Sequence, residues 1–315
     1  MKIASLFSGY DSALIALEHL NISYELAFWS EIDKTAITAH NNYFPNYKEK
    51  NIGDIINFTT ANTKLDLLVY TPPCQDLSRA GRMKGANKGS NTRSSLLWES
   101  EKVIRATTPK ILIMEEVPTL LSTFKDTIQQ WIKSLEKIGY TSIPAILNTA
   151  DFGIPQNRKR LYLISSIDTP PHIELLIQKR KPKPIIEFLD NLEEIPENLW
   201  LKKEIKNLLI QDKQETPIIL GPSKYCSDKT MNNYHSKNLV NTITTHNDYP
   251  DTSLIFYSQN KIRRLSHIER ARLQGLADED IKKLFKNLTP TSCNKLIGNA
   301  LSINVITEIL KILVL

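Results

Sequence analysis

Short apolar runs alternate with stretches of helical spacing through the first 166 residues of the chain. The apolar runs, which predict strands, are 2–7, 24–31, 65–73, 110–116, 141–148 and 160–166. Apolar residues recur at helical spacing in 12–20, 33–43, 94–106 and 124–137. Such alternation predicts an α/β fold, with a mostly parallel sheet and helices on both faces. Ligands of such sheets bind outside the carboxyl ends of the strands.

The pattern changes after residue 167. The stretch TPPHIELLIQKRKPKP (169–184) is basic and rich in proline, which favours a linker, and 185–260 is polar and predicts no topology. RRLSHIERARLQGL, from residue 263, predicts a helix. KLIGNALSINVITEILKILVL (295–315) predicts an apolar helix that packs back on the first domain and is too short and interrupted to span a membrane.

The composition is that of a soluble globular protein. The chain has 315 residues, 41% of them hydrophobic and 23% charged, and neither a membrane-length apolar run nor a signal-peptide layout. A net charge of +6 is compatible with a polyanionic partner without identifying one. The three cysteines, Cys74, Cys226 and Cys293, have neither disulfide nor metal-site spacing, so we expect a reducing cytosol and no metal.

Three strand ends carry residues suited to a nucleoside. The turn SLFSGYDS brings Gly9 to the end of the first strand, and Glu31 follows the second, where a carboxylate accepts hydrogen bonds from ribose hydroxyls. Asp54, in GDI, ends another apolar stretch. Each feature alone is explained by an ordinary turn or a helix cap. Their order along the chain favours a nucleoside-type cofactor.

Three further motifs could carry chemistry. In TPPC the prolines fix Cys74, which is either an exposed nucleophile or a small buried hydrophobe. In MEEVP, Glu115 and Glu116 point to opposite faces of a strand, so one of them enters a given pocket unless both are solvated. In QNRKR, Arg158 and Arg160 share one face of an extended segment and converge on a ligand, or belong to a surface charge run.

These pieces occur together in a particular order. The set LFSG, SEIDK, GDI, PPCQDLSRAG, MEEVP, DFGIPQNRKR, RRLSHIERARLQGL and KLIGNALSINV resembles the cytosine-C5 DNA methyltransferase family, of the bacterial restriction-modification type. It covers both ends of the chain, and about 170–260 has no recognisable motif. The resemblance implies a Rossmann-like large domain, 1–170 with 293–315, and a small domain, 171–292, whose region 185–260 recognises the target.

The resemblance assigns roles to individual residues. It makes Cys74 the nucleophile that attacks C6 of a flipped cytosine and Glu115 the acid at N3, with Arg160 and Arg158 supporting the cytosine O2 and the active-site loop. The methyl donor is S-adenosylmethionine, which becomes S-adenosylhomocysteine. The cofactor contacts are Phe7, Gly9, Tyr10, Asp11, Ser12, Glu31, Ile32, Asp54, Ile55, Pro73, Leu96, Asn299 and Ala300. The DNA contacts are Gln75, Ser78, Arg79, Arg82, Gln156, Thr242, Thr244, Thr245 and Arg263.

The polar segment 76–95 contains Arg79, Arg82, Lys84, Lys88 and Arg93. Its basic side chains suit contacts with phosphates, and we expect it to close over flipped DNA. The partners expected are double-stranded DNA and a restriction endonuclease for the same site, and not a membrane. We expect a monomer in a bacterial cytosol.

Two positions depart from the family pattern. Tyr10-Asp11-Ser12 follows Gly9 where relatives carry more glycine, and Glu116 stands where Asn is usual. We expect Glu116 to face away from the cytosine and to add a buried negative charge near the cysteine loop. Two alternative functions remain open from the sequence. One is a tRNA cytosine-C5 methyltransferase, and the other is an inactive DNA-binding protein, which the presence of Cys74, Glu115 and Arg160 disfavours.

Overall fold

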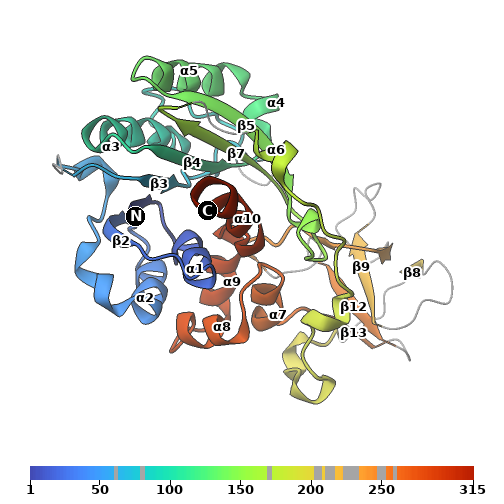
Figure 1. The fold of residues 1–315 in the computed structure, drawn as a ribbon. Coiled ribbons are helices and arrows are strands. Elements are labelled where there is room, and N and C mark those ends of the chain that lie inside the picture. The colour runs from blue at the N-terminus through green and yellow to red at the C-terminus, as the bar shows by residue number, and fades with distance from the viewer. Residues whose placement is uncertain are drawn as a thin grey trace. The chain divides into compact units, whose positions relative to one another are not determined.

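A computed structural model describes residues 1–59, 63–78, 82–168, 172–201, 208–209, 217–222, 234–246, 253–257 and 261–315. The chain forms two compact units (Figure 1). Unit 1 comprises Met1–Leu147, Lys159–Gln178 and Val305–Leu315. Unit 2 comprises Asn148–Arg158 and Lys179–Asn304. This division differs from the predicted domain boundaries, because 148–158 and all of 293–304 belong to unit 2, whereas 171–178 belongs to unit 1.

A six-stranded sheet with the order β2-β1-β3-β4-β7-β5 forms the centre of unit 1. Its strands are β1 (Lys2–Leu6), β2 (Glu25–Ser30), β3 (Leu67–Tyr70), β4 (Ile111–Glu116), β5 (Thr141–Asn148) and β7 (Lys159–Ser166). β2, β1, β3 and β4 run parallel, and β7 is antiparallel to β4. The six strands that the apolar runs predict are all present, and the prediction of an α/β fold with a mostly parallel sheet is confirmed.

Helices cover this sheet, and Figure 1 shows α1 on the opposite side from α3 and α5. The helices that belong wholly or partly to unit 1 are α1 (Ser12–His19), α2 (Lys34–Tyr43), α3 (Glu99–Thr107), α4 (Thr119–Ser122), α5 (Lys125–Glu136), α6 (Ile173–Leu176) and α10 (Ile303–Val314). Asp33 caps α2 by accepting hydrogen bonds from two backbone N–H groups of its first turn. 3₁₀ helices lie at Pro45–Lys50, Ile55–Asn57 and Arg93–Trp98, and the last of these leads directly into α3.

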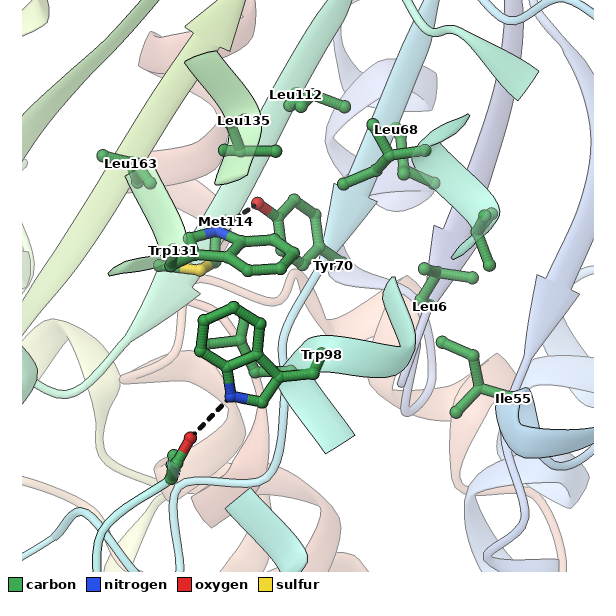
Figure 2. Close-up of a cluster of buried hydrophobic side chains, with 14 of the residues drawn as sticks. Leu6, Ile55, Leu68, Tyr70, Trp98, Leu112, Met114, Trp131, Leu135 and Leu163 are labelled. Atoms are coloured by element: carbon green, nitrogen blue, oxygen red, sulfur yellow. Dashed lines mark hydrogen bonds between the residues drawn. The ribbon is translucent and has the colours of Figure 1, made fainter. Parts of the chain in front are cut away.

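One core cluster lies between the sheet and the helices α3 and α5 (Figure 2). The rings of Trp98 and Trp131 meet edge-on, with centroids 5.4 Å apart and planes at 81°. Trp131 is fully buried, and its indole N–H donates to the hydroxyl of Tyr70 at 3.2 Å. Truncating a buried tryptophan to alanine costs about 3–5 kcal/mol, so this cluster is a major source of stability beneath the carboxyl ends of β3 and β4.

A five-stranded sheet with the order β13-β12-β9-β10-β8 belongs to unit 2. Its strands are β8 (Leu208–Leu209), β9 (Ile218–Pro222), β10 (Tyr234–Lys237), β12 (Leu254–Tyr257) and β13 (Lys261–Arg264). A second, two-stranded sheet pairs β6 (Gln156–Asn157) with β11 (Val240–Asn241). The polar region 185–260, for which the sequence predicts no topology, therefore supplies most strands of the five-stranded sheet.

The helices of unit 2 are α7 (His267–Arg272), α8 (Asp278–Leu284) and α9 (Pro290–Asn299). Short 3₁₀ helices lie at Thr149–Asp151, Ile185–Phe188, Leu192–Glu194 and Glu197–Leu199. The prediction of a helix from residue 263 is wrong for Arg263 and Arg264, which lie in β13 and pair with Ile255 and Leu254 of β12. The helix begins only after Ser266, which forms a capping box with Glu269.

The apolar stretch Pro290–Val314 has the length and composition of a membrane span, alone among the described residues. Buried core helices of soluble proteins share these properties. Here the helix ends at Asn299 and resumes at Ile303, and Ile306 and Ile309 are fully buried. The stretch is therefore weak evidence for a span, and the interruption agrees with the one expected from the sequence.

Candidate active site

One row of paired residues crosses the sheet of unit 1 at its carboxyl edge. Ser30 of β2 and Tyr70 of β3 both pair with Leu6 of β1, and Tyr70 pairs in turn with Met114 of β4. Each strand leads to a candidate site residue: Phe7 and Glu31 directly follow β1 and β2, Cys74 lies four residues after the end of β3, and Glu115 is the last residue but one of β4. Parallel strands in register thus bring residues from four separate motifs to one edge, where ligands of such sheets bind.

Glu115 forms an ion pair with Arg160 at this edge. The Arg160 Nε lies 3.1 Å from the Glu115 Oε1, and the two side chains are 17% and 12% exposed. The strand register explains the contact, because Glu115 pairs with Tyr162 of β7, and Arg160 lies two residues from Tyr162 on the same face. A guanidinium at this distance fixes the direction of the carboxylate while leaving part of it accessible.

Glu116, the next residue of β4, is only 1% exposed. Its Oε2 accepts a hydrogen bond from the Val117 backbone N–H at 2.8 Å, and its Oε1 has no hydrogen-bond partner among the described residues. Burial raises the pKa of this carboxyl well above its usual 4.5, and the neighbouring Glu115 adds to the rise, while the Val117 N–H and Arg160 oppose it. Burial therefore works against the extra negative charge that the sequence leads us to expect at this position.

Cys74 is a partly buried thiol on a tight turn. The backbone N–H groups of Leu77 and Ser78 both donate to its carbonyl oxygen, at 3.0 and 2.9 Å, and its side chain borders the core cluster. Cys293, in contrast, is fully buried, and burial raises its thiol pKa to about 12. Cys74 therefore suits a nucleophile better than Cys293, whose thiol stays protonated at neutral pH. Cys226 lies outside the described residues.

The Glu31 carboxylate organises the turns after β1 and β2. It accepts from the backbone N–H of Gly9 at 2.9 Å through Oε2, and from those of Ile32 and Asp33 at 2.7 and 2.8 Å through Oε1. The Ile32 side chain beside it is 64% exposed. Asp54 accepts from the Ile56 N–H at 3.0 Å. A carboxylate beside an exposed apolar surface fits a nucleoside, with its ribose on the acid and its base on the isoleucine.

The residues after Gly9 turn inward. Tyr10, Asp11 and Ser12 are at most 4% exposed, which leaves their side chains little surface for a cofactor. Asp11, rather than Ser12, caps α1, with a backbone φ of 65° and a hydrogen bond from the Leu14 N–H. Burial raises the pKa of its carboxyl to about 7, although hydrogen bonds from the Ser5 hydroxyl and the Leu14 N–H oppose the rise. This turn is built from packed side chains where relatives would carry glycine.

Of the remaining cofactor candidates, Ile55 is buried, whereas Pro73 and Leu96 are partly exposed in unit 1. Asn299 is exposed and Ala300 partly exposed in unit 2. No group of three or more metal-ligating side chains occurs in the part of the chain that the structure describes.

Arg158 does not share the face of Arg160. It is 2% exposed, and its guanidinium donates to the backbone carbonyls of Ile243 at 3.0 Å, Gly298 at 3.2 Å and Ala300 at 2.8 Å. β7 begins only at Lys159, so the strand alternation that would align the two arginines does not extend to Arg158. Its guanidinium is engaged in holding unit 2 together, and the role that the resemblance assigns to Arg158 stays a prediction.

Two predicted DNA contacts are buried in unit 2. Gln156 is fully buried, where it donates to the Leu273 carbonyl at 2.7 Å and accepts from the Ile243 N–H at 3.0 Å. Arg263 is also fully buried, in a two-pronged ion pair with Glu269 at 2.7 and 2.6 Å. Both predictions are wrong, because neither side chain reaches a surface that DNA could contact.

The other predicted DNA contacts differ in accessibility. Gln75 and Arg82 are exposed and Ser78 is partly exposed, whereas Arg79 lies outside the described residues. In unit 2, Thr244 is exposed, and Thr242 and Thr245 are partly exposed. The Thr242 hydroxyl donates to the Asn157 carbonyl at 2.7 Å. These residues remain candidates on grounds of accessibility.

Comparison with known proteins decides the family. The model of the C-5 cytosine-specific DNA methylase family matches residues 1–314. This chain belongs to that family. It is 32% identical to the orphan methyltransferase M.SssI of Spiroplasma monobiae over 276 residues, which are 84% of this chain and 69% of the relative. It is 30% identical to the type II methyltransferase M.HaeII of Haemophilus aegyptius over 317 residues, covering 98% of this chain and 91% of the relative.

The fold of this C-5 cytosine methylase also has solved counterparts. The crystal structure of the Dnmt2 methyltransferase of S. pombe superimposes with a TM-score of 0.73 at 17% identity, covering 99% of this chain and 98% of that one. A likeness at this identity concerns the fold alone, and it agrees with a Rossmann-like S-adenosylmethionine-dependent methyltransferase. It is the family membership that makes the enzyme a DNA cytosine-C5 methyltransferase, as the sequence motifs imply.

Proposed function

We propose that this methylase modifies a flipped-out cytosine through a covalent bond between Cys74 and C6 of the base. The observation that carries the proposal is the position of three residues at one edge of the sheet: Cys74 after β3, Glu115 near the carboxyl end of β4, and Arg160 near the start of the antiparallel β7. Glu115 and Arg160 are paired there at 3.1 Å. Cytosine C5 is a weak nucleophile. Addition of a thiolate at C6 converts the ring into an enamine-like species whose C5 is nucleophilic.

Each residue then has a defined task. The Cys74 sulfur forms a bond to C6 as the C5–C6 double bond opens, while Glu115 holds N3 and the exocyclic amine by hydrogen bonds. Arg160 keeps the Glu115 carboxylate directed at the ring and faces the O2 side. C5 would take the methyl group as the bond between that group and the donor sulfur breaks, and the donor would leave as S-adenosylhomocysteine with the electron pair on its sulfur. The proton on C5 would then leave to a base, for which a water molecule suffices. The electrons of the C5–H bond then reform the double bond and expel Cys74.

We place the cofactor at the carboxyl ends of β1 and β2. S-adenosylmethionine supplies an electrophilic methyl group on a sulfonium. Glu31 receives the ribose hydroxyls, and the exposed Ile32 packs against the adenine. Asp54 accepts from the adenine amine, and Gly9, whose φ is +58° and which has open space beside its Cα, lets the ligand approach the backbone.

The target is double-stranded DNA, and the base leaves the helix before reaction because C6 is inaccessible within the stack. The net charge of +6 favours this partner. The exposed Gln75 and Arg82 follow the nucleophile and contact the DNA near the flipped base, and Thr244 contacts a phosphate. We assign target recognition to the region 185–260.

The biological setting is inferred from relatives. A type II methyltransferase among them supports a role as the modification half of a restriction-modification system, with an endonuclease that cuts the same site. An orphan relative supports the alternative of an enzyme without such a partner. We propose a monomeric enzyme of a bacterial cytosol.

The test is transfer of label from S-adenosylmethionine to three samples: genomic duplex DNA, tRNA and no nucleic acid. We expect label in DNA at C5 of cytosine, and a denaturation-resistant adduct with duplex DNA that contains 5-fluorocytosine. The adduct should be absent in Cys74→Ala and present in Cys293→Ala, the matched control. Label in tRNA alone would exclude the DNA assignment, and an adduct that survives Cys74→Ala would exclude the nucleophile.

A further inference from the structure

Two buried polar side chains join the ends of the segment that follows Cys74. Ser94 is fully buried and Asp76 is 4% exposed. The Asp76 backbone N–H donates to the Ser94 hydroxyl at 3.1 Å, and the Ser94 backbone N–H donates to the Asp76 Oδ2 at 3.3 Å. The two residues are 18 positions apart in the sequence. The reciprocal pair therefore closes the neck of the segment 76–94.

The same serine hydroxyl also reaches the other side of the nucleophile. Ser94 Oγ donates to the carbonyl oxygen of Pro73 at 2.5 Å. The hydroxyl thus donates its proton to residue 73, just before Cys74, and accepts a hydrogen bond from residue 76, two residues after Cys74. Cys74 lies between these two anchoring points, so this single side chain constrains the backbone that carries the thiol from both directions.

Other bonds also hold the segment, and some of them end on the Cys74 turn, as where the Gly85 N–H donates to the Asp76 carbonyl at 2.9 Å. The indole N–H of Trp98, visible in Figure 2, donates to the Ala86 carbonyl at 2.8 Å. The Thr127 hydroxyl bonds to the Asn87 side chain at 2.9 Å. The Thr119 hydroxyl also donates to the Leu77 carbonyl at 2.6 Å, within the Cys74 turn. Ser94 differs from these side chains because it bonds the backbone on both sides of Cys74.

We propose that Ser94 is a positioning residue for Cys74, which aligns the thiol for attack by bridging Pro73 and Asp76. The proposal rests on the assignment of Cys74 as nucleophile. In-line attack on C6 requires the sulfur to be held within a fraction of an ångström, and a misplacement of about 1 Å costs on the order of 100-fold in rate. Loss of the bridge leaves the Pro73 carbonyl and the Asp76 N–H to seek other partners, which shifts the turn.

Ser94→Ala removes the bridge, and Ser100→Ala is its matched control. Ser100 is equally buried in α3, and its hydroxyl has no hydrogen-bond partner among the described residues. The readouts are the rate of adduct formation with 5-fluorocytosine duplex DNA, kcat for methylation, and KM for S-adenosylmethionine. We expect Ser94→Ala to slow adduct formation and lower kcat by about 10- to 100-fold, with KM within about threefold of wild type. Ser100→Ala should match wild type in all three.

A wild-type rate of adduct formation in Ser94→Ala would overturn the positioning role, and so would an equal loss in Ser100→Ala. If Ser94→Ala does not fold, Ser94→Cys decides, because a thiol of similar size is a weaker donor and should give an intermediate rate. A wild-type rate in Ser94→Cys would then overturn the proposal. Failure of the underlying function is distinguishable, since wild-type enzyme would then form no Cys74-dependent adduct at all.

Discussion

Replacing Arg263 by methionine separates a structural role from a role in DNA binding. The guanidinium is fully buried, bonds both oxygens of Glu269 at 2.7 and 2.6 Å, and donates to the Tyr257 hydroxyl at 2.9 Å. Glu269 is itself fully buried, so Arg263→Met leaves a carboxylate without its counter-ion in the interior of unit 2. Breaking a buried pair in this way costs about 3–5 kcal/mol, whereas an exposed pair is worth about 0–1 kcal/mol.

Thermal unfolding and DNA binding at several salt concentrations test this reasoning. At roughly 2 °C per kcal/mol for a protein of this size, we expect Tm to fall by about 6–10 °C. The slope of log Kd against log salt should stay at the wild-type value. The control is Arg264→Met, because this neighbouring strand residue is partly exposed and should change Tm little. An Arg263→Met enzyme with wild-type Tm and a salt slope smaller by about 0.9 would refute the argument, since that pattern indicates one lost phosphate contact.

Three further outcomes follow from the site and its surroundings. Glu115→Gln should lower kcat at least about 100-fold, because it removes the carboxyl group that holds N3 of the cytosine, whereas Glu116→Asn should lower kcat far less. A larger loss of kcat in Glu116→Asn than in Glu115→Gln would contradict the assignment. Burial raises the pKa of the Asp11 carboxyl to about 7. The free energy of unfolding of the wild type is therefore unaffected by this group's ionisation below about pH 4, and it falls as the pH rises to about 7. The Tm of Asp11→Asn relative to wild type should therefore increase over that window, and a constant difference would exclude the shift. Gly298→Ala should lower Tm, because its Cβ would lie 2.2 Å from the Thr244 carbonyl carbon, and an unchanged Tm would show that this packing yields easily.

The sequence predicts the sheet of unit 1, and the edge at which its parallel strands end, for a physical reason. Strands buried on both faces are read as continuous apolar runs, and they end where polar or glycine-containing turns begin. Because parallel strands align their carboxyl ends, residues such as Glu31, Cys74 and Glu115 come together without any knowledge of long-range contacts. The alternation of side chains along β4 also separates Glu115 from Glu116, as expected, since one meets Arg160 and the other is buried.

The failures share a different cause, which is burial of polar residues by distant segments. Nothing local in QNRKR shows that Gln156 meets Leu273 and Gln274, which are 117 and 118 positions away. Likewise, Ser94 joins Asp76 across 18 positions, and serine and aspartate in a polar segment look like solvated residues. A charged motif is expected at the protein surface. The pairing of Arg263 with Glu269 depends on how β13 packs against α7, which the sequence alone does not show.

The two arginines of QNRKR lie two residues apart in the sequence but have quite different surroundings in the structure. Arg158 is the last residue of a segment of unit 2, and Lys159 begins β7 of unit 1, so the chain passes between units within this motif. Arg160 is governed by the register of β7 against β4, which directs it to Glu115. Arg158 is governed by three carbonyls from two distant segments of unit 2, at Ile243 and at the end of α9. Two arginines that look like a joint binding site for one ligand therefore have different partners: Arg160 pairs with Glu115 of unit 1, and Arg158 bonds to backbone carbonyls of unit 2.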